Sequence, residues 1–394
     1  MYERYVMESH PDVELGIPRK PIEYFVTRPS TPLNNNTGLL FTICGYGQMA
    51  NEVYWLEKLN PYLADQYNCL VVNINYYGIN RTTSPQVNDN AFALARNAYG
   101  YNLDNPSLPF DTRINNFLSW VHARGIQLLD ARFNEFMFLE SEEYNSFGFL
   151  PALDHLMVLG RLLKDEEFNH QRIMVLGTSY GGYIGQLMGK FAPNTFAVII
   201  DNSGFSRTRL GDLLTKELWK YGNLIRLGPN NEVNVFFSHN YPWTIYDETS
   251  PYYFSDACRC IRSLLHEKHR LKSSTRYYVF HSVCDNDIAP IADKDKVVEQ
   301  LKRYNSIFYK RVTAEDIDGR LFKNLEHGMD ASLKGIFNYV ADLERAKGYD
   351  FNQEGIDDFK AAHTFCFSCG LKDYIFEYNS DYQMSVSIVD HKDI

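Results

Sequence analysis

The feature that most constrains the fold is an alternation of short apolar runs with longer segments of helical periodicity. Apolar runs rich in β-branched and aromatic residues occur at 21–27, 38–44, 69–75, 172–177, 196–201, 276–283 and 306–313. Helical patterns follow them at 51–65, 151–167, 181–191, 255–271, 292–303 and 330–347. Strands that alternate with helices form a mainly parallel sheet, and runs that are apolar throughout are typical of strands buried on both faces. The sequence therefore predicts an α/β fold with a mostly parallel central sheet flanked by helices.

Two of the predicted helices carry recognisable end signals. Pro151 suits a first helical turn, where its missing N–H costs nothing. Asp330 is available as the N-cap of the last helix, and Gly348 stands just past the end of that helix.

Two connections are much longer than a turn requires. Residues 79–149 separate one strand from its helix, and residues 204–254 separate another strand from the next helix. Because loops longer than about 15 residues are usually functional or contain their own structure, we predict two insertions that cover the sheet. Helical patterns at 113–138 and 209–227 favour helical insertions, which act either as a lid over a pocket or as decoration.

Residues 349–394 form a C-terminal extension beyond the last helix. Its alternating segment YIFEYNSDYQMSVSIV predicts a hairpin, to which we assign no function. The chain of 394 residues is thus predicted to be a single domain that carries two insertions and this extension.

The composition limits the classes of partner. The formal net charge of −10 and the absence of a basic stripe argue against nucleic-acid binding. The N-terminal residues lack the features of a signal peptide, and no run approaches the roughly 18 apolar residues of a membrane span. We therefore expect a cytoplasmic protein without a membrane or nucleic-acid partner, and the sequence does not predict its oligomeric state.

Aromatic residues are abundant, at 15% of the chain. Those in the predicted insertions include Tyr101, Trp120, Trp219 and Trp243. They either line a ligand pocket or pack against one another within the insertions, and the sequence favours neither.

The seven cysteines form an odd, scattered set, which is typical of reduced thiols rather than of a disulfide framework. Two local clusters resemble zinc motifs. Cys258 and Cys260 precede His266 and His269, and the run HTFCFSC contains His363, Cys366 and Cys369. The first cluster lies on a predicted helix and the second on a predicted strand, so neither offers the paired knuckles of a structural zinc site. We predict no metal and no cofactor.

Ser179 lies in GTSYGG, between a predicted strand and a predicted helix. Gly177, Ser179 and Gly181 match the G-x-S-x-G pattern, in which a serine occupies a sharp strand-to-helix turn and flanking glycines permit close packing. The patterns of phosphate-binding loops, G-x-x-x-x-G-K-[ST] and G-x-G-x-x-G, are absent here. Ser179 is therefore the candidate nucleophile.

A serine nucleophile needs a base and an acid that orients the base. In folds with this turn, the acid and then the histidine follow the serine along the chain. Among the late histidines, His327 lies in a loop before the last helix, whereas His363 and His391 lie in the C-terminal extension. The candidate acids, which all follow predicted strands, are Asp285, Asp287 and Asp201.

The reaction also creates an oxyanion, which requires two N–H donors. One predicted donor is the backbone N–H of Tyr180, directly after the nucleophile. The second is expected from the turn after the strand at 38–44, where Tyr46 and Gly47 are the candidates.

These segments together resemble the α/β-hydrolase superfamily over roughly residues 20–347. GTSYGG resembles the nucleophile turn, CGYGQ stands in place of the frequent His-Gly-x-Gly oxyanion turn, HSVCDNDIAP is similar to the acid segment, and EHG to the histidine loop. The resemblance implies an α/β-hydrolase fold and a triad of Ser179, Asp285 and His327. The sequence departs from the family pattern at Cys44, which replaces a histidine, and at Ser282, which replaces a glycine.

Two narrower resemblances bear on the substrate. Ser-Tyr-Gly-Gly is similar to the catalytic domains of prolyl-oligopeptidase-type peptidases, which usually also carry a propeller domain for which 394 residues leave no room. The segment ICGYGQMAN resembles an uncharacterised family of bacterial hydrolase-like proteins from organisms that glycosylate their flagellins. That second resemblance implies an acylated carbohydrate as substrate.

The hypothesis drawn from these residues is a serine hydrolase that cleaves an ester through an acyl-enzyme. Its substrate is a small-molecule ester, which includes O-acyl and O-acetyl groups on a sugar. An O-acyltransferase and a prolyl-oligopeptidase-like peptidase are the alternatives that use the same triad, and a non-catalytic binding module is the least favoured.

Overall fold

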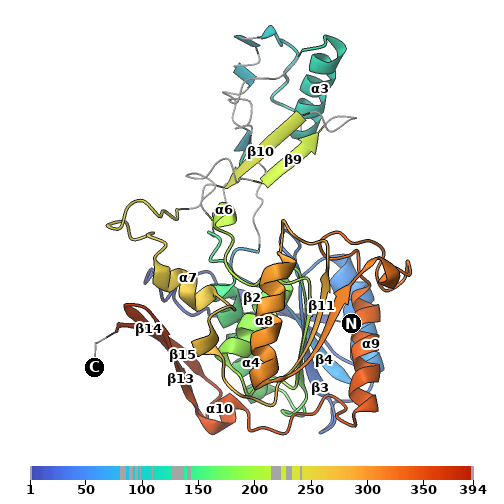
Figure 1. Ribbon diagram of the computed structural model, residues 1–394, viewed down its shortest axis with the longest axis vertical. Helices are drawn as coiled ribbons and strands as arrows, with labels where there is room; N and C mark the ends of the chain where they lie inside the picture. Colours follow the sequence, from blue (N-terminus) through green and yellow to red (C-terminus); the bar gives the residue numbers. More distant parts are fainter. Residues whose placement is uncertain are drawn as a thin grey trace. The chain divides into compact units, whose positions relative to one another are not determined.

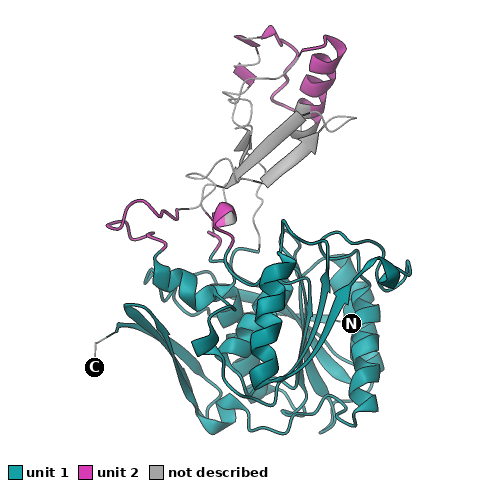
Figure 2. Ribbon diagram, in the orientation of Figure 1, with its two compact units in different colours: residues 1–79, 146–208, 255–394 teal, residues 80–145, 209–254 magenta. Residues whose placement is uncertain are grey.

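A computed structural model divides the chain into two compact units (Figure 2). Unit 1 contains residues 1–79, 146–208 and 255–394, and unit 2 contains residues 80–145 and 209–254. The structure describes residues 2–79, 143–213 and 242–391, together with 86–87, 92–93, 96–97, 99–108, 110–126, 137–139, 223–227 and 233–239.

Unit 1 is built on an eight-stranded sheet (Figure 1). In spatial order the strands are β1 (Tyr2–Met7), β2 (Ile22–Thr27), β4 (Cys69–Asn75), β3 (Gly38–Ile43), β7 (Ile173–Thr178), β8 (Val198–Asn202), β11 (Arg276–Ser282) and β12 (Ser306–Val312). From β4 to β12 the strands run parallel, whereas β2 is antiparallel to both of its neighbours. This strand order is that of the α/β-hydrolase fold, and the predicted fold class is confirmed.

Helices flank the sheet (Figure 1). They are the π-helix η1 (Tyr54–Leu59), α1 (Asn60–Tyr67), α4 (Phe149–Asp165), α5 (Tyr180–Phe191), α7 (Asp256–Arg262), α8 (Ile291–Tyr304) and α9 (Leu333–Ala346). α1 contacts α9, where the ring of Tyr67 lies 4.7 Å from that of Phe337. α5 contacts α4 and lies against β7 and β8. Because helices cover the sheet, every residue of β3, β8 and β11 is buried.

All seven predicted strands are present, and β1 is an additional strand that the sequence patterns did not predict. Its segment YERYVM is mostly exposed, because β1 is the edge strand of the sheet. An edge strand with one neighbour carries no continuous apolar run, so its pairing with β2 is not visible in the hydrophobic pattern.

Two helix boundaries differ from those predicted. The helix predicted over 255–271 ends at Arg262 and is followed by a short 3-10 helix, η4 (Glu267–His269). The N-cap of α9 is Ser332, whose hydroxyl accepts a hydrogen bond from the N–H of Gly335 at 3.1 Å. The prediction of Asp330 as the N-cap is wrong, because Asp330 lies two residues before the cap and forms an ion pair with Lys323.

Unit 2 contains both a helix and a small sheet. The helix α3 (Phe110–Ala123) overlaps the first predicted helical segment, 113–138, and that prediction is wrong at residues 137–138, which belong to a strand. The sheet has the order β5 (Gln86–Val87), β6 (Met137–Leu139), β10 (Val233–His239) and β9 (Asn223–Leu227). The helix predicted over 209–227 is therefore wrong at residues 223–227, where backbone pairing with β10 replaces the local helical pattern. Before it, α6 (Leu210–Leu213) is a single helical turn.

Described aromatic residues of unit 2 pack against one another. The ring of Tyr101 lies 5.3 Å from that of Trp120, and the ring of Trp243 lies 5.2 Å from that of Phe254. Tyr101 and Trp243 are buried. Of the four aromatic residues singled out in the sequence, Trp219 lies outside the described residues.

The C-terminal extension forms an antiparallel sheet of β13 (Thr364–Cys369), β14 (Lys372–Tyr378) and β15 (Met384–Asp390). A short helix, α10 (Asp358–Ala361), precedes it. The hairpin predicted from the alternating segment is confirmed as β14 and β15. The sheet packs on α5, where the ring of Phe376 stacks on that of Phe191 at 4.5 Å.

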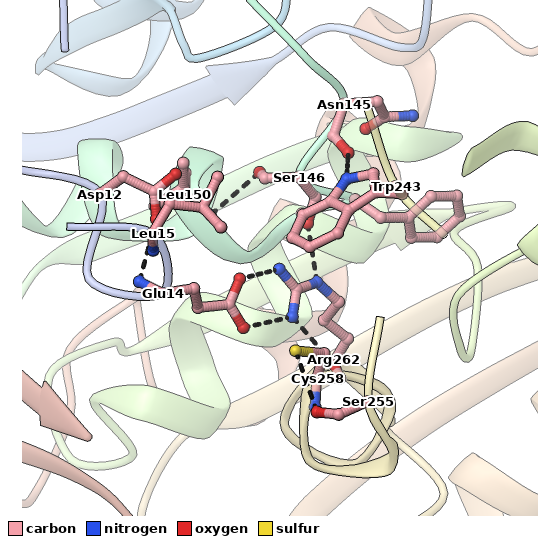
Figure 3. Close-up of polar contacts among 12 residues, drawn as sticks. Asp12, Glu14, Leu15, Asn145, Ser146, Leu150, Trp243, Ser255, Cys258 and Arg262 are labelled. Carbon is pink, nitrogen blue, oxygen red and sulfur yellow. Dashed lines mark hydrogen bonds and ion pairs between the residues drawn. The ribbon is translucent and has the colours of Figure 1, made fainter. Parts of the chain in front are cut away.

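A buried ion pair joins the N-terminal segment to α7 (Figure 3). The guanidinium of Arg262, on α7, forms two hydrogen bonds with the carboxylate of Glu14. Tyr374 of β14 donates its hydroxyl to the same carboxylate at 2.9 Å. Three separate parts of the chain therefore meet at one carboxylate.

None of the helices in the described part of the chain is long and apolar enough to cross a membrane.

Candidate active site

Ser179 occupies the sharp turn between β7 and α5. Its backbone has φ 53° and ψ −121°, a conformation that non-glycine residues rarely adopt and that costs about 1–3 kcal/mol. Its N–H is held by the carbonyl of Asn202 at 2.7 Å, which anchors the turn to the end of β8. The strain presents the serine hydroxyl at the carboxyl edge of the sheet.

Close backbone approach explains the glycines around this serine. A Cβ on Gly177 would lie 2.3 Å from the carbonyl oxygen of Gly181, and a Cβ on Gly181 would lie 2.1 Å from that of Ile43. Real Cβ atoms do not come so near to backbone oxygens, so both positions require glycine for the turn to be this tight.

His327 lies beside the serine. The Oγ of Ser179 and the Nε2 of His327 are 2.7 Å apart, although the two residues are 148 positions apart in the sequence. The histidine loop between β12 and α9 is fixed by the N–H of Met329, which donates to the carbonyl of Glu326. The ring of Phe205 stacks on the His327 imidazole at 6.0 Å with an angle of 10° between their planes.

Asp285 contacts the other side of the histidine. Its Oδ2 lies 2.6 Å from the Nδ1 of His327, and its Oδ1 accepts the N–H of Ala289 at 3.0 Å. Burial raises the pKa of Asp285, but hydrogen bonds from His327 and Ala289 outweigh the burial, so the pKa is lowered overall. The ionised carboxylate accepts a hydrogen bond from Nδ1–H, which leaves the lone pair of Nε2 available to accept the serine proton.

The other two candidate acids do not contact His327. Asp287 is exposed on the loop that follows β11. Asp201 is buried at the end of β8, where Lys294 of α8 donates to its carboxylate at 2.7 Å. Gln186 of α5 donates to the same carboxylate, so Asp201 links α5 and α8.

The two later histidines also have other partners. The Nδ1 of His363 lies 2.7 Å from Asp358, and the Nδ1 of His391 lies 2.9 Å from Asp373. Both pairs lie in the C-terminal extension. Among the three histidines considered from the sequence, His327 is the one beside Ser179.

The turn after β3 lies against the serine turn. A Cβ on Gly45 would lie 3.4 Å from the Cβ of Ser179, and the ring of Tyr46 contacts the ring of Tyr180 edge-on at 5.8 Å. Gly47 adopts a φ of +84°, which lets the turn reverse sharply. The three predicted oxyanion residues, Tyr46, Gly47 and Tyr180, thus belong to two adjacent turns, with Tyr180 at the first position of α5. The phenol of Tyr180 is occupied separately, because it accepts the N–H of Gly148 at 2.5 Å.

The structure adds a contact between two loops of the site that the sequence reasoning missed. The Ser282 hydroxyl donates to the carbonyl of Leu325 at 2.6 Å and accepts the N–H of Cys284 at 3.1 Å. It therefore ties the acid loop to the histidine loop. The departure from the family's glycine at position 282 was visible in the sequence, but its partner 43 residues away was not.

A depression of about 420 Å³ borders the acid side of the site. Asp285 and His327 line it together with Cys284, Asn286, Asp287, Ile288, Leu325 and Glu326. Its wall therefore consists of the acid loop and the histidine loop. Away from it, Cys260, His269 and Cys369 lie close enough together to hold a metal ion.

Comparison with protein families gives one match. The model of a family described as "Protein of unknown function (DUF2920)" matches residues 3–388. Among curated proteins, none matches this sequence.

Solved structures with a similar chain fold include two peptidases. The acylaminoacyl peptidase of Pyrococcus horikoshii is 14% identical with a TM-score of 0.46, and the match covers 90% of this chain and 43% of that one. A puromycin-hydrolyzing peptidase of Mycobacterium tuberculosis is 12% identical with a TM-score of 0.48, and the match covers 90% of this chain and 41% of that one. This chain thus spans less than half the length of either peptidase.

A third similar structure is Est1E of Butyrivibrio proteoclasticus with ferulic acid bound. It is 13% identical with a TM-score of 0.41, and the match covers 83% of this chain and 95% of that one. Likeness at this level concerns the fold alone.

Proposed function

We propose that this chain, which belongs to the DUF2920 family, is a serine hydrolase that cleaves an ester through an acyl-enzyme. The observation that carries the proposal is the continuous relay from Ser179 through His327 to Asp285, with contacts of 2.7 and 2.6 Å. A serine hydroxyl is a weak nucleophile on its own, and this relay supplies both the base and the group that orients the base.

In the proposed reaction, the Oγ of Ser179 forms a bond to the acyl carbon while its proton passes to the Nε2 of His327. The tetrahedral intermediate then collapses, and the alcohol leaves with the proton that His327 returns. Water attacks the acyl-enzyme in the second half, loses its proton to His327 and releases the acid. Asp285 stays ionised throughout and stabilises the imidazolium that forms in each half.

The negative charge on the acyl oxygen needs donors placed in advance. We assign this role to the backbone N–H of Tyr180 and to one N–H of the turn at Tyr46 and Gly47. The support is the adjacency of the two turns and the position of Tyr180 at the N-terminus of α5, where a helix favours negative charge.

The direct test is covalent labelling with a fluorophosphonate probe, followed by intact mass spectrometry. We expect one probe per chain in the wild type and none in Ser179→Ala. Ser203→Ala is the matched control, because Ser203 is a second serine with positive φ at a strand end, and it should label as the wild type does. A folded wild type that takes up no probe, or equal labelling of Ser179→Ala, would disprove the proposal.

The substrate class is tested with the same readout. Incubation with acyl donors should add the mass of one acyl group to Ser179, and the accepted donors identify the acyl group. Short esters, acetylated sugars and dipeptide amides then separate an esterase from a prolyl-oligopeptidase-like peptidase. Transfer to an added alcohol, in place of release of the acid, would identify an O-acyltransferase that uses the same residues.

A further inference from the structure

Two cysteines and a histidine from distant parts of unit 1 lie together, away from the serine. Cys260 is on α7, His269 is in η4, and Cys369 ends β13. One ligand atom of each residue lies within 4.8 Å of the others. The sequence distributes these residues over two separate clusters, and the packing of α7 against β13 combines members of both.

The histidine has the hydrogen bonding typical of a metal ligand. His269 is only 4% exposed, and its Nε2 lies 2.9 Å from the carbonyl oxygen of Ser368. Because a carbonyl only accepts, Nε2 carries the proton and Nδ1 carries the lone pair. In the described part of the chain, Nδ1 is buried with no hydrogen-bond partner. Histidine ligands commonly donate one N–H to a backbone carbonyl while the other nitrogen binds the metal.

The donor set selects the kind of ion. Thiolate and imidazole ligands favour zinc and other thiophilic cations over magnesium or calcium. Around a tetrahedral zinc ion, with Zn–S near 2.3 Å and Zn–N near 2.0 Å, neighbouring ligand atoms are roughly 3.5 Å apart. Atoms within 4.8 Å of one another reach that spacing through small side-chain movements.

A second histidine and the amino group of Lys190 lie near the cluster. The ring of His266 lies 4.0 Å from that of His269, and the Nδ1 of His266 is also buried with no partner among the described residues. The ammonium of Lys190 donates to the carbonyls of Ile261 and Ser263.

We propose that Cys260, His269 and Cys369 bind a zinc ion that fastens β13 of the C-terminal extension to α7. Two thiol protons are released to solvent on binding, and no oxidant is needed. The site is structural, lies apart from Ser179, and does not depend on the function proposed above.

Zinc binding is tested on the full chain, stripped of metal with a chelator and kept reduced. Titration with Zn²⁺ against a chromophoric chelator should give one tightly bound ion per chain. Cys260→Ser, Cys369→Ser and His269→Ala should each weaken binding at least about 100-fold. Cys366→Ser and Cys284→Ser are the matched controls, because both thiols are exposed and lie outside the set, and they should bind as the wild type does.

A spectroscopic measurement covers the case in which the variants fail to fold. Cobalt added to the wild type should produce thiolate-to-metal absorption and the intense visible bands of a tetrahedral ion, which zinc then displaces. A wild type without these bands and without bound zinc would overturn the proposal. So would a Cys260–Cys369 disulfide found by peptide mapping in a chain that binds no zinc when reduced, and that result would assign the pair to redox chemistry.

Discussion

Ser179 shows how the role of one residue depends on its backbone. A serine in an ordinary loop rarely occupies φ 53°. Here the strained backbone is held by the hydrogen bond from the N–H of Ser179 to the carbonyl of Asn202, and by glycines that permit contact between β7 and α5. Contact with the histidine is decided at the same scale. Asp285 and Asp287 are only two residues apart. Asp285 is buried and contacts His327, whereas Asp287 is exposed.

The first prediction separates these two aspartates. Asp285→Asn should lower kcat for ester cleavage about 10³- to 10⁴-fold, because an amide in this position favours the wrong histidine tautomer. Asp287→Asn should change kcat less than about twofold. Steady-state kinetics on both variants measures this, and the reverse ranking would move the acid role to Asp287.

A second residue-scale prediction concerns pH. Burial raises the pKa of Asp357 to about 6; hydrogen bonds from Thr195 and Phe359 oppose the rise, and repulsion from Asp358 adds to it. An unfolded aspartate has a pKa near 3.9, so the folded chain binds this proton more tightly and the free energy of unfolding falls as pH rises from about 4 to 6.

Asp357→Asn removes that titration. Relative to the wild type, the free energy of unfolding of this variant should rise by on the order of 2 kcal/mol between pH 4.5 and pH 7.5, as measured by urea unfolding at both values. Asp381→Asn, at an exposed position, is the control, and its free energy of unfolding should change with pH as that of the wild type does. A constant difference between Asp357→Asn and the wild type across this pH range would contradict the prediction.

At the scale of elements, the site depends on loops that follow strands in the parallel part of the sheet. β7 presents the serine, β11 the acid and β12 the histidine, because parallel strands end at the same edge of the sheet. The positions of these strands along the chain, and therefore the sequence of their loops, were predictable from alternating apolar runs. The link between the acid and histidine loops through Ser282 was not, since a hydroxyl gives no pattern that identifies a distant carbonyl.

Ser282→Ala should therefore lower the rate of acyl-enzyme formation by about tenfold with little change in KM, because looser loops misplace the imidazole. Burst kinetics measures that rate. Ser306→Ala, at the exposed start of β12, serves as the control. If Ser282→Ala acylates at the wild-type rate, the hydroxyl is not a positioning group.

At the scale of the whole molecule, contacts between the two ends of the chain are prominent in unit 1. Glu14, Arg262 and Tyr374 join the N-terminal segment, α7 and the C-terminal sheet (Figure 3). Both partners of the ion pair are almost fully buried, with side chains 0% and 4% exposed. Removing one partner of a buried pair leaves an uncompensated charge.

Glu14→Gln should therefore destabilise unit 1 by about 3–5 kcal/mol in urea unfolding. Glu8→Gln, in the same segment but exposed, should change stability by less than about 0.5 kcal/mol. If both substitutions lowered the free energy of unfolding equally, the ion pair between Glu14 and Arg262 would not be a specific source of stability.

The amino-acid sequence alone determined the strands of the parallel sheet and the turn at Ser179, because apolar periodicity and glycine spacing are local signals. Tertiary structure brings Asp285, the acid that the family resemblance implies, rather than Asp201 into contact with His327, since Asp201 is held by Lys294. It also decided that residues 223–227 pair as a strand and that Cys260 meets Cys369. These outcomes depend on partners between 6 and 109 residues away along the chain, and only packing brings such partners together.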